Sequence, residues 1–172
     1  MNEKIIQHSI EYVLSLLIID RMKNDCKEFS DEKILKLIDD LWGALSKKIT
    51  KKLLKDGKKY INQIIVDEQG ASKEGMLINF LAYSLDELIF QLLDADGFSG
   101  DGVIDYRVQE VEFVEQEHIL RSSKNVSLNF YQEEDVRKKG DEEIEYIKSL
   151  KERLGRLKLA QLSDRNYIFR SL

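Results

Sequence analysis

Lys73–Leu93 reads KEGMLINFLAYSLDELIFQLL and is the most apolar long segment of this 172-residue chain. Its apolar side chains recur at spacings of three and four residues, which is the period of an α-helix. They cover far more than one face, and a helix that is apolar almost all round belongs inside a bundle. The segment therefore predicts a mainly α-helical bundle, which we expect to contain about four to five helices. The apolar positions are Met76, Leu77, Phe80, Leu81, Leu85, Leu88, Ile89, Leu92 and Leu93.

The composition is that of a globular chain, and we expect no membrane partner. Apolar residues make up 42% of the chain and charged residues 34%, and the absence of proline favours long helices. Asp86 and Glu87 lie at the centre of the apolar segment. Each of these charges would cost roughly 3 kcal/mol in lipid. We predict a single domain over residues 1–172, and the one place where it could divide is near residues 67–72.

Cysteine usage and the N-terminal segment predict a cytoplasmic protein. Cys26 is the one cysteine, so the chain cannot form an internal disulfide framework. Glu3 and Glu11 interrupt the first apolar segment, and no small-residue cleavage site follows it, so it does not resemble a signal peptide.

Charge is segregated along the chain. Residues 1–60 carry 13 basic and 10 acidic side chains, residues 61–135 carry 4 and 16, and residues 136–172 carry 10 and 6. The overall net charge of −5 therefore hides a strongly acidic middle between two basic ends. A field of this kind speeds encounter with a partner of opposite charge.

The acidic middle is densest in Asp94–Glu117, which reads DADGFSGDGVIDYRVQEVEFVEQE. Arg107 is the lone basic residue within it. We predict that the acidic side chains of this segment bind a basic protein partner. They are Asp94, Asp96, Asp101, Asp105, Glu110, Glu112, Glu115 and Glu117.

The same segment does not predict a metal or cofactor site. Gly100–Asp105, GDGVID, resembles the second half of a calcium-binding loop. That alignment places Gly97 and Ser99 at the first two ligand positions and Val108 where a bidentate Glu is needed. Glu115 and His118 have ExxH spacing, but a di-metal helical bundle needs two such pairs and further carboxylates.

Residues 103–131 predict either a small antiparallel β element or a helix. Val, Ile, Tyr and Phe are enriched there, as in strands, and apolar and acidic residues alternate around Val111 and Phe113. Val126, Leu128 and Phe130 alternate with polar residues, which is typical of a half-buried strand. We favour two or three strands and keep a helix as the alternative.

The first half of the chain predicts two helices. The first runs from Asn2 to about Asn24, and the second runs from the cap residue Ser30 to Gly57. The polar side of the second helix is strongly basic, which offers contact with phosphates, although no aromatic residues interleave for base stacking. We therefore regard direct nucleic-acid binding as an alternative function. The basic residues are Lys47, Lys48, Lys51, Lys52 and Lys55.

The C-terminal part predicts a last helix opened by Gly140 and Asp141. Its apolar residues between Ile144 and Leu162 lie close to heptad spacing. We expect this stripe to pack on the bundle, and a homo-oligomer or helical scaffold through the same stripe is the alternative. Tyr167–Phe169 is expected either to fold back onto the core or to form a loose tail.

The motifs of common enzymes are missing from the sequence. There is no P-loop, GxGxxG, GxSxG, HExxH or CxxC pair. We therefore predict a non-enzymatic, acidic, protein-binding inhibitor of the bacterial immunity or antitoxin type. Such a protein would neutralise a basic partner, for example a nuclease toxin, by covering its nucleic-acid-binding cleft. The chain shares the acidic character of that functional class but carries no motif of a particular family.

Overall fold

The computed structural model describes residues 8–27, 29–94, 98–123 and 127–172. Within these ranges the chain is mainly helical and contains no β-strand, so the predicted mainly α-helical class is confirmed. The same ranges contain eight α-helices, rather than the four to five that we expected, because the predicted long segments are divided by turns. The helices are α2 (Ser9–Asp25), α3 (Glu32–Gly43), α4 (Lys51–Ile64), η1 (Glu68–Gly70, a 3₁₀ helix), α5 (Lys73–Leu93), α6 (Asp101–Ser123), α7 (Phe130–Gly155), α8 (Leu159–Leu162) and α9 (Arg165–Ser171).

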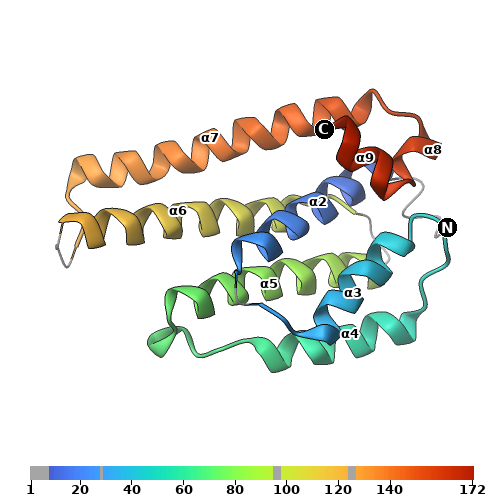
Figure 1. Ribbon diagram of the computed structural model, residues 1–172, viewed down its shortest axis with the longest axis horizontal. Coiled ribbons are helices and arrows are strands. Elements are labelled where there is room, and N and C mark those ends of the chain that lie inside the picture. Colours follow the sequence, from blue (N-terminus) through green and yellow to red (C-terminus); the bar gives the residue numbers. More distant parts are fainter. Residues whose placement is uncertain (1–7, 28, 95–97, 124–126) are drawn as a thin grey trace.

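Helix α5 lies inside the bundle, as its apolar surface predicts. It packs against α2, α4 and α6 (Figure 1). By length and composition α5 could also cross a membrane, and among the described residues it alone meets that test. However, 61% of its apolar window is buried inside the protein, as in the core helix of a soluble bundle.

Helix α2 is buried on several sides. Every residue from 12 to 20 is buried, because α2 runs between α5, α6 and α7 (Figure 1). Tyr12 brings a hydroxyl into this core and donates it to the carbonyl of Leu41 at 2.8 Å. The predicted start at Asn2 lies outside the described residues.

The β element predicted within residues 103–131 is wrong for the described residues. Residues 101–123 form α6, and Phe130 already begins α7; Val126 lies outside the described residues. The most deeply buried residues of α6 are Val103, Arg107 and Glu110, at spacings of four and three. Helical spacing therefore decides this segment, because it turns these three side chains toward the same neighbours.

Helix α7 begins with a capping motif at Asn129 and Gln132, although the alternation of apolar and polar residues there predicts a strand. The Asn129 side chain accepts the backbone N–H of Gln132 at 3.0 Å, and the Gln132 side chain accepts the backbone N–H of Asn129 at 3.0 Å. This reciprocal pair is a capping box, which satisfies two N–H groups that a helix start otherwise leaves unpaired.

The helix predicted from Ser30 to Gly57 is divided in two. Asp31, rather than Ser30, caps α3, and the chain turns back between residues 44 and 50 before Thr50 caps α4. Gly57 does not end a helix but lies inside α4, where α3 approaches closely. A Cβ atom at Gly57 would lie 2.7 Å from Cδ1 of Leu37.

The last helix starts ten residues before the predicted Gly140. Gly140 lies inside α7 where α6 crosses, and a Cβ atom there would lie 2.5 Å from Oε1 of Glu112. The predicted apolar stripe packs on the bundle: Ile147, Leu150 and Leu154 are buried in α7 and Leu162 in α8.

The C-terminal segment folds back onto the core rather than forming a loose tail. Ile168 of α9 is fully buried, and Arg165 donates to the buried carboxylate of Asp20 at 3.0 and 3.2 Å. Asp20 also accepts the indole N–H of Trp42 at 2.9 Å. Helix α9 is therefore held against both α2 and α3.

The position at which the chain could divide contains η1. Helices α4 and α5 pack against one another on either side of it. The Asn79 side chain makes two hydrogen bonds of 2.9 Å to the backbone of Val66. The single domain over residues 1–172 stays a prediction.

Candidate partner-binding surface and buried charge cluster

The predicted partner-binding residues do not form one continuous face. Asp94 is the C-cap residue of α5, and Asp96 lies outside the described residues. Asp101 opens α6 and Asp105 follows one turn later, and both are exposed. These two carboxylates therefore lie on the same side of α6.

Further along α6, the acidic residues point in different directions. Glu115 and Glu117 are both half-exposed, but two helical positions turn the side chain by roughly 200°. Glu117 forms an ion pair with Arg121 at 3.2 Å, one turn further on. Glu112 is half-buried beside Gly140, and burial raises its pKa above the ordinary value.

Glu110 is buried rather than presented to a partner, with 1% of its surface exposed. It belongs to a group of five charged side chains that we call the Arg107 cluster. The cluster joins α2, α6 and α7. Its members are Arg21, Asp25, Arg107, Glu110 and Glu143.

Arg107 lies at the centre of the Arg107 cluster. Its Nη1 donates to Asp25 at 2.6 Å and to Glu110 at 2.7 Å, and its Nε donates to Glu143 at 3.0 Å. Arg21 approaches the same Glu143 carboxylate from α2, at 2.7 and 3.3 Å. The single basic residue of the acidic stretch thus neutralises carboxylates from three helices.

The cluster holds one carboxylate more than it holds guanidinium groups, and Glu110 shows the consequence. Its Oε2 is paired with Arg107, whereas its buried Oε1 has no hydrogen-bond partner among the described residues. Burial raises the pKa of Glu110 to about 7, against the opposing effect of Arg107. Burial lowers the pKa of Arg107, but the facing carboxylates outweigh this effect, so its pKa stays above the ordinary value.

Cys26 lies at the end of α2 close to this cluster and is unsuited to nucleophilic catalysis. Its thiol is buried, and burial together with the negative charge of Glu110, Glu74 and Asp25 raises its pKa to about 12. The thiolate is the reactive form of cysteine, and these surroundings suppress it.

A pocket of about 470 Å³ opens beside the Arg107 cluster, and we call it the α5–α6 pocket. Its lining combines charged side chains with the apolar side chains of Leu77, Val111 and Val114. The residues that line it are Asp25, Lys27, Lys73, Glu74, Leu77, Arg107, Glu110, Val111, Val114 and Glu115. Of the predicted acidic residues, this pocket brings together Glu110 and Glu115.

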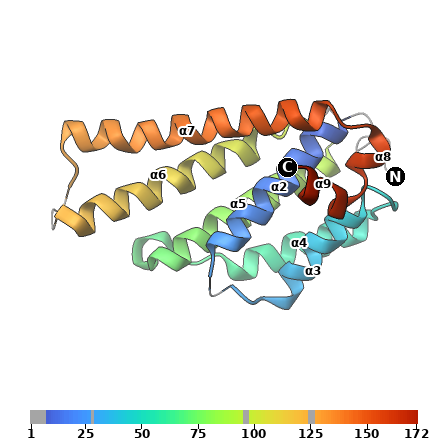
Figure 2. The same cartoon turned by 45° about the horizontal axis from the view of Figure 1, so that its top comes forward.

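The α6–α7 hairpin extends beyond the ends of α2 and α5 (Figures 1 and 2). At the beginning of α7, Phe130 is 65% exposed and Tyr131 is 76% exposed, and their rings meet edge to face at 5.8 Å. Exposed acidic residues follow directly in the sequence. We call Phe130, Tyr131, Glu133, Glu134 and Asp135 the hairpin tip.

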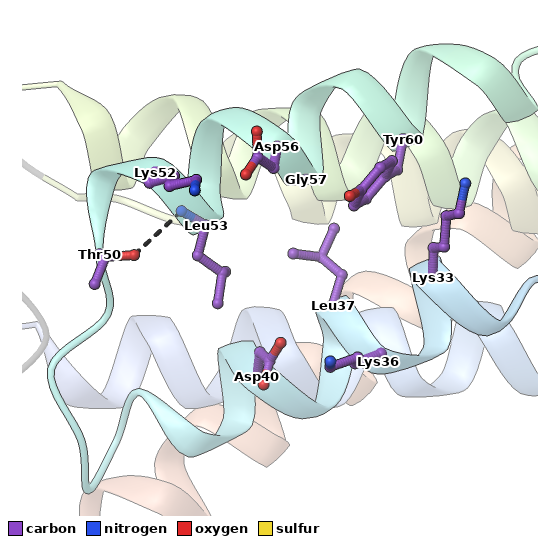
Figure 3. A pocket seen from close by; sticks show the side chains of 10 residues that line it. All are labelled: Lys33, Lys36, Leu37, Asp40, Thr50, Lys52, Leu53, Asp56, Gly57 and Tyr60. Carbon is purple, nitrogen blue, oxygen red and sulfur yellow. Dashed lines mark hydrogen bonds between the residues drawn. The ribbon is translucent and has the colours of Figure 1, made fainter.

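The basic residues predicted from the sequence lie on the other side of the molecule, around α4. All five predicted lysines between residues 47 and 55 are exposed. A pocket of about 390 Å³ lies between α3 and α4 (Figure 3). Leu37 and Leu53 point into it, while Asp40 and Asp56 lie among its lysines, so the lining has mixed charge.

Sequence reasoning missed most of the Arg107 cluster. Arg21 and Asp25 lie one turn apart on α2 and Glu143 lies on α7, and nothing local joins either helix to Arg107. The available signal was Arg107 itself, followed three positions later by Glu110, since residues three apart on a helix are neighbours.

The described residues contain no group of three or more His, Cys, Asp or Glu side chains placed to hold a metal ion. No protein-family model matches the chain, and no curated protein or solved structure matches it at a significant level.

Proposed function

We propose that the chain is a cytoplasmic, acidic, protein-binding inhibitor of the immunity or antitoxin type. Its partner is a basic protein such as a nuclease toxin, and binding covers the partner's nucleic-acid-binding cleft. The observation that supports this proposal is the hairpin tip, where two exposed aromatic rings stand beside three exposed carboxylates on a projecting helical hairpin.

The two kinds of side chain contribute differently to such an interface. Aromatic residues are the commonest anchors of binding energy, because they bury a large area at low entropic cost. Phe130 and Tyr131 are exposed in the free chain, so a partner would gain from covering them. The carboxylates supply charge complementarity, which raises the association rate and disfavours acidic competitors.

Two of the acidic residues that we predicted to bind the partner are not free to do so. Glu110 lies inside the protein and Glu117 is paired with Arg121. Asp101, Asp105 and Glu115 remain accessible on α6. We therefore place the centre of the proposed interface at the hairpin tip. Asp101 and Asp105 lie near the opposite end of α6, roughly 30 Å away, so Glu115 is the nearest of the three to the tip.

The test is a capture experiment with matched variants. The tagged chain is immobilised at low salt, exposed to lysate of the source organism, and eluted in salt steps. We expect a basic protein to elute as salt rises, because the attraction is electrostatic and screened. The captured protein is then assayed for nuclease activity with and without the chain.

Phe130→Ala/Tyr131→Ala and Glu134→Lys/Asp135→Lys should each abolish capture and inhibition. Glu145→Lys/Glu152→Lys reverses two exposed charges on the same helix outside the hairpin tip and should leave both unchanged. Equal capture by all variants would overturn the proposal.

The two alternative functions give different outcomes in the same experiment. Direct nucleic-acid binding predicts recovery of nucleic acid without protein, lost on reversal of Lys47, Lys48 and Lys51. Assembly of a scaffold predicts recovery of the chain itself. The apolar stripe that such an assembly would use is largely occupied by the chain's own core at Ile147, Leu150 and Leu154.

A further inference from the structure

The α5–α6 pocket borders a buried carboxylate whose hydrogen bonding is incomplete. Glu110 lines the pocket, and its Oε2 accepts from Arg107 at 2.7 Å. Its Oε1 is buried with no partner among the described residues. Buried polar groups are nearly always paired in folded proteins, so an unpaired oxygen on a carboxylate residue that lines a cavity points to a missing donor.

The charge of the surroundings indicates what kind of donor is missing. The pocket and the cluster behind it together hold five carboxylates and four basic side chains, which leaves one negative charge uncompensated when Glu110 is ionised. The carboxylates are Asp25, Glu74, Glu110, Glu115 and Glu143, and the basic residues are Arg21, Lys27, Lys73 and Arg107. A donor with a single positive charge would balance the site.

The shape and lining of the pocket indicate the rest of the ligand. Its volume of about 470 Å³ falls in the range of small-ligand sites, roughly 300 to 1,000 Å³. Leu77, Val111 and Val114 supply an apolar surface next to Glu110. A short hydrocarbon chain carrying the charge at one end would cover this surface.

We propose that the α5–α6 pocket binds a primary alkylammonium group, with its carbon chain along Leu77, Val111 and Val114 and its ammonium donating to the Glu110 carboxylate. The group belongs either to a free amine or to a lysine side chain. An ammonium is a compact charge with three donors, whereas Arg107 already supplies the planar guanidinium of this site.

Binding should be coupled to the protonation of Glu110. Its neighbours are Asp25 and Arg21 on α2, Cys26 after α2, Glu74 on α5, Arg107 on α6 and Glu143 on α7. Burial raises the pKa of Glu110 to about 7, so its carboxyl group changes from protonated to ionised near neutral pH. A bound cation is attracted to the ionised form. Binding should therefore strengthen as pH rises from 6 to about 8.

The experiment follows backbone amide NMR shifts of the full chain during titration with n-butylamine hydrochloride, and with n-butanol as the uncharged counterpart. We expect saturable shifts around Leu77 and Val111 for the amine only. Glu110→Gln, which keeps the side-chain shape, should weaken binding about tenfold or more, because a charge-assisted hydrogen bond is lost. Glu117→Gln changes a carboxylate on the same helix outside the pocket and should bind like the wild type.

Further arms separate the two sources of the ammonium and protect the test against misfolding. Binding of N-acetyl-lysine methylamide as well as n-butylamine would assign the pocket to a lysine side chain. Binding of n-butylamine alone would assign it to a free amine. If Glu110→Gln fails to fold, Glu115→Gln at the half-exposed pocket wall takes its place and should weaken binding.

Equal binding of amine and alcohol, unchanged binding by Glu110→Gln, or no saturable shift would each overturn the proposal. Glu134→Lys/Asp135→Lys should leave amine binding unchanged. The outcome for amine binding in the pocket is therefore independent of whether the hairpin tip binds a basic partner.

Discussion

Arg107 and Glu143 are 36 positions apart in the sequence, yet Nε of Arg107 donates to Oε1 of Glu143 at 3.0 Å between α6 and α7. The same carboxylate accepts from Arg21 of α2, and the guanidinium of Arg21 lies 4.3 Å from the ring centroid of Tyr146. The Glu143 carboxylate thus connects both helices of the projecting hairpin to α2.

Breaking the Arg107 cluster should strongly destabilise the fold. Arg107→Met leaves the carboxylates of Asp25, Glu110 and Glu143 without the cation that they share. Removing one member of a buried ion pair costs about 3 to 5 kcal/mol. Urea unfolding followed by circular dichroism measures this loss. Arg121→Met removes an exposed ion pair and should change the unfolding free energy by less than about 1 kcal/mol. Equal effects of the two substitutions would contradict a central role for Arg107.

Glu110 should make stability depend on pH in a direction opposite to that of ordinary surface carboxylates. Its pKa rises from 4.5 to about 7 in the folded protein, so the folded state holds a proton that the unfolded state has released. This contribution is fully present below pH 4.5 and is lost as pH rises to about 7. At roughly 1.4 kcal/mol per pH unit, it amounts to about 3 kcal/mol.

The corresponding measurement is the unfolding free energy of the wild type and Glu110→Gln at intervals between pH 4.5 and 8. As pH rises across this interval, the unfolding free energy of the wild type should fall relative to that of Glu110→Gln. Glu117→Gln, at a half-exposed position, provides the matched comparison and should parallel the wild type. A difference that stays constant with pH would refute the assignment.

Two glycines should respond to alanine with opposite signs. A Cβ atom at Gly57 would lie 2.7 Å from Cδ1 of the buried Leu37, and overpacking of this kind costs about 1 to 3 kcal/mol. At Gly43, in the last turn of α3, nothing lies within 4 Å. Gly43→Ala should therefore raise stability by up to about 1 kcal/mol through helix propensity. Thermal unfolding of both variants measures the contrast, and a stabilised Gly57→Ala would show that α3 and α4 are not in close contact.

Arg165 should hold the C-terminal helix against the core, and Trp42 reports on it. Arg165 donates to Asp20 and its guanidinium lies 5.0 Å from the Trp42 ring centroid, while Phe169 lies 5.8 Å from the same ring. Arg165→Ala should loosen α9 and shift the emission of the single tryptophan to longer wavelength. Arg170→Ala, on the exposed side of α9, should leave the emission unchanged. An unshifted spectrum for Arg165→Ala would argue against this anchoring.

The sequence by itself determined the features that depend on local spacing and composition. The apolar surface of Lys73–Leu93 required a buried helix, because no single face could hold it. The helical bundle, the apolar stripe of α7 and the acidic middle of the chain follow from the same kind of pattern.

The tertiary structure decided the features that depend on neighbours. The alternating residues of 103–120 suit a strand as well as a helix, and packing against α2, α5 and α7 selected the helix. Counting carboxylates predicted one acidic surface, whereas Glu110 is buried beside Arg107, which also pairs with Asp25 of α2 and Glu143 of α7. A buried charge needs paired groups, which here come largely from distant segments of the chain. No local sequence pattern shows which distant residues will make those contacts.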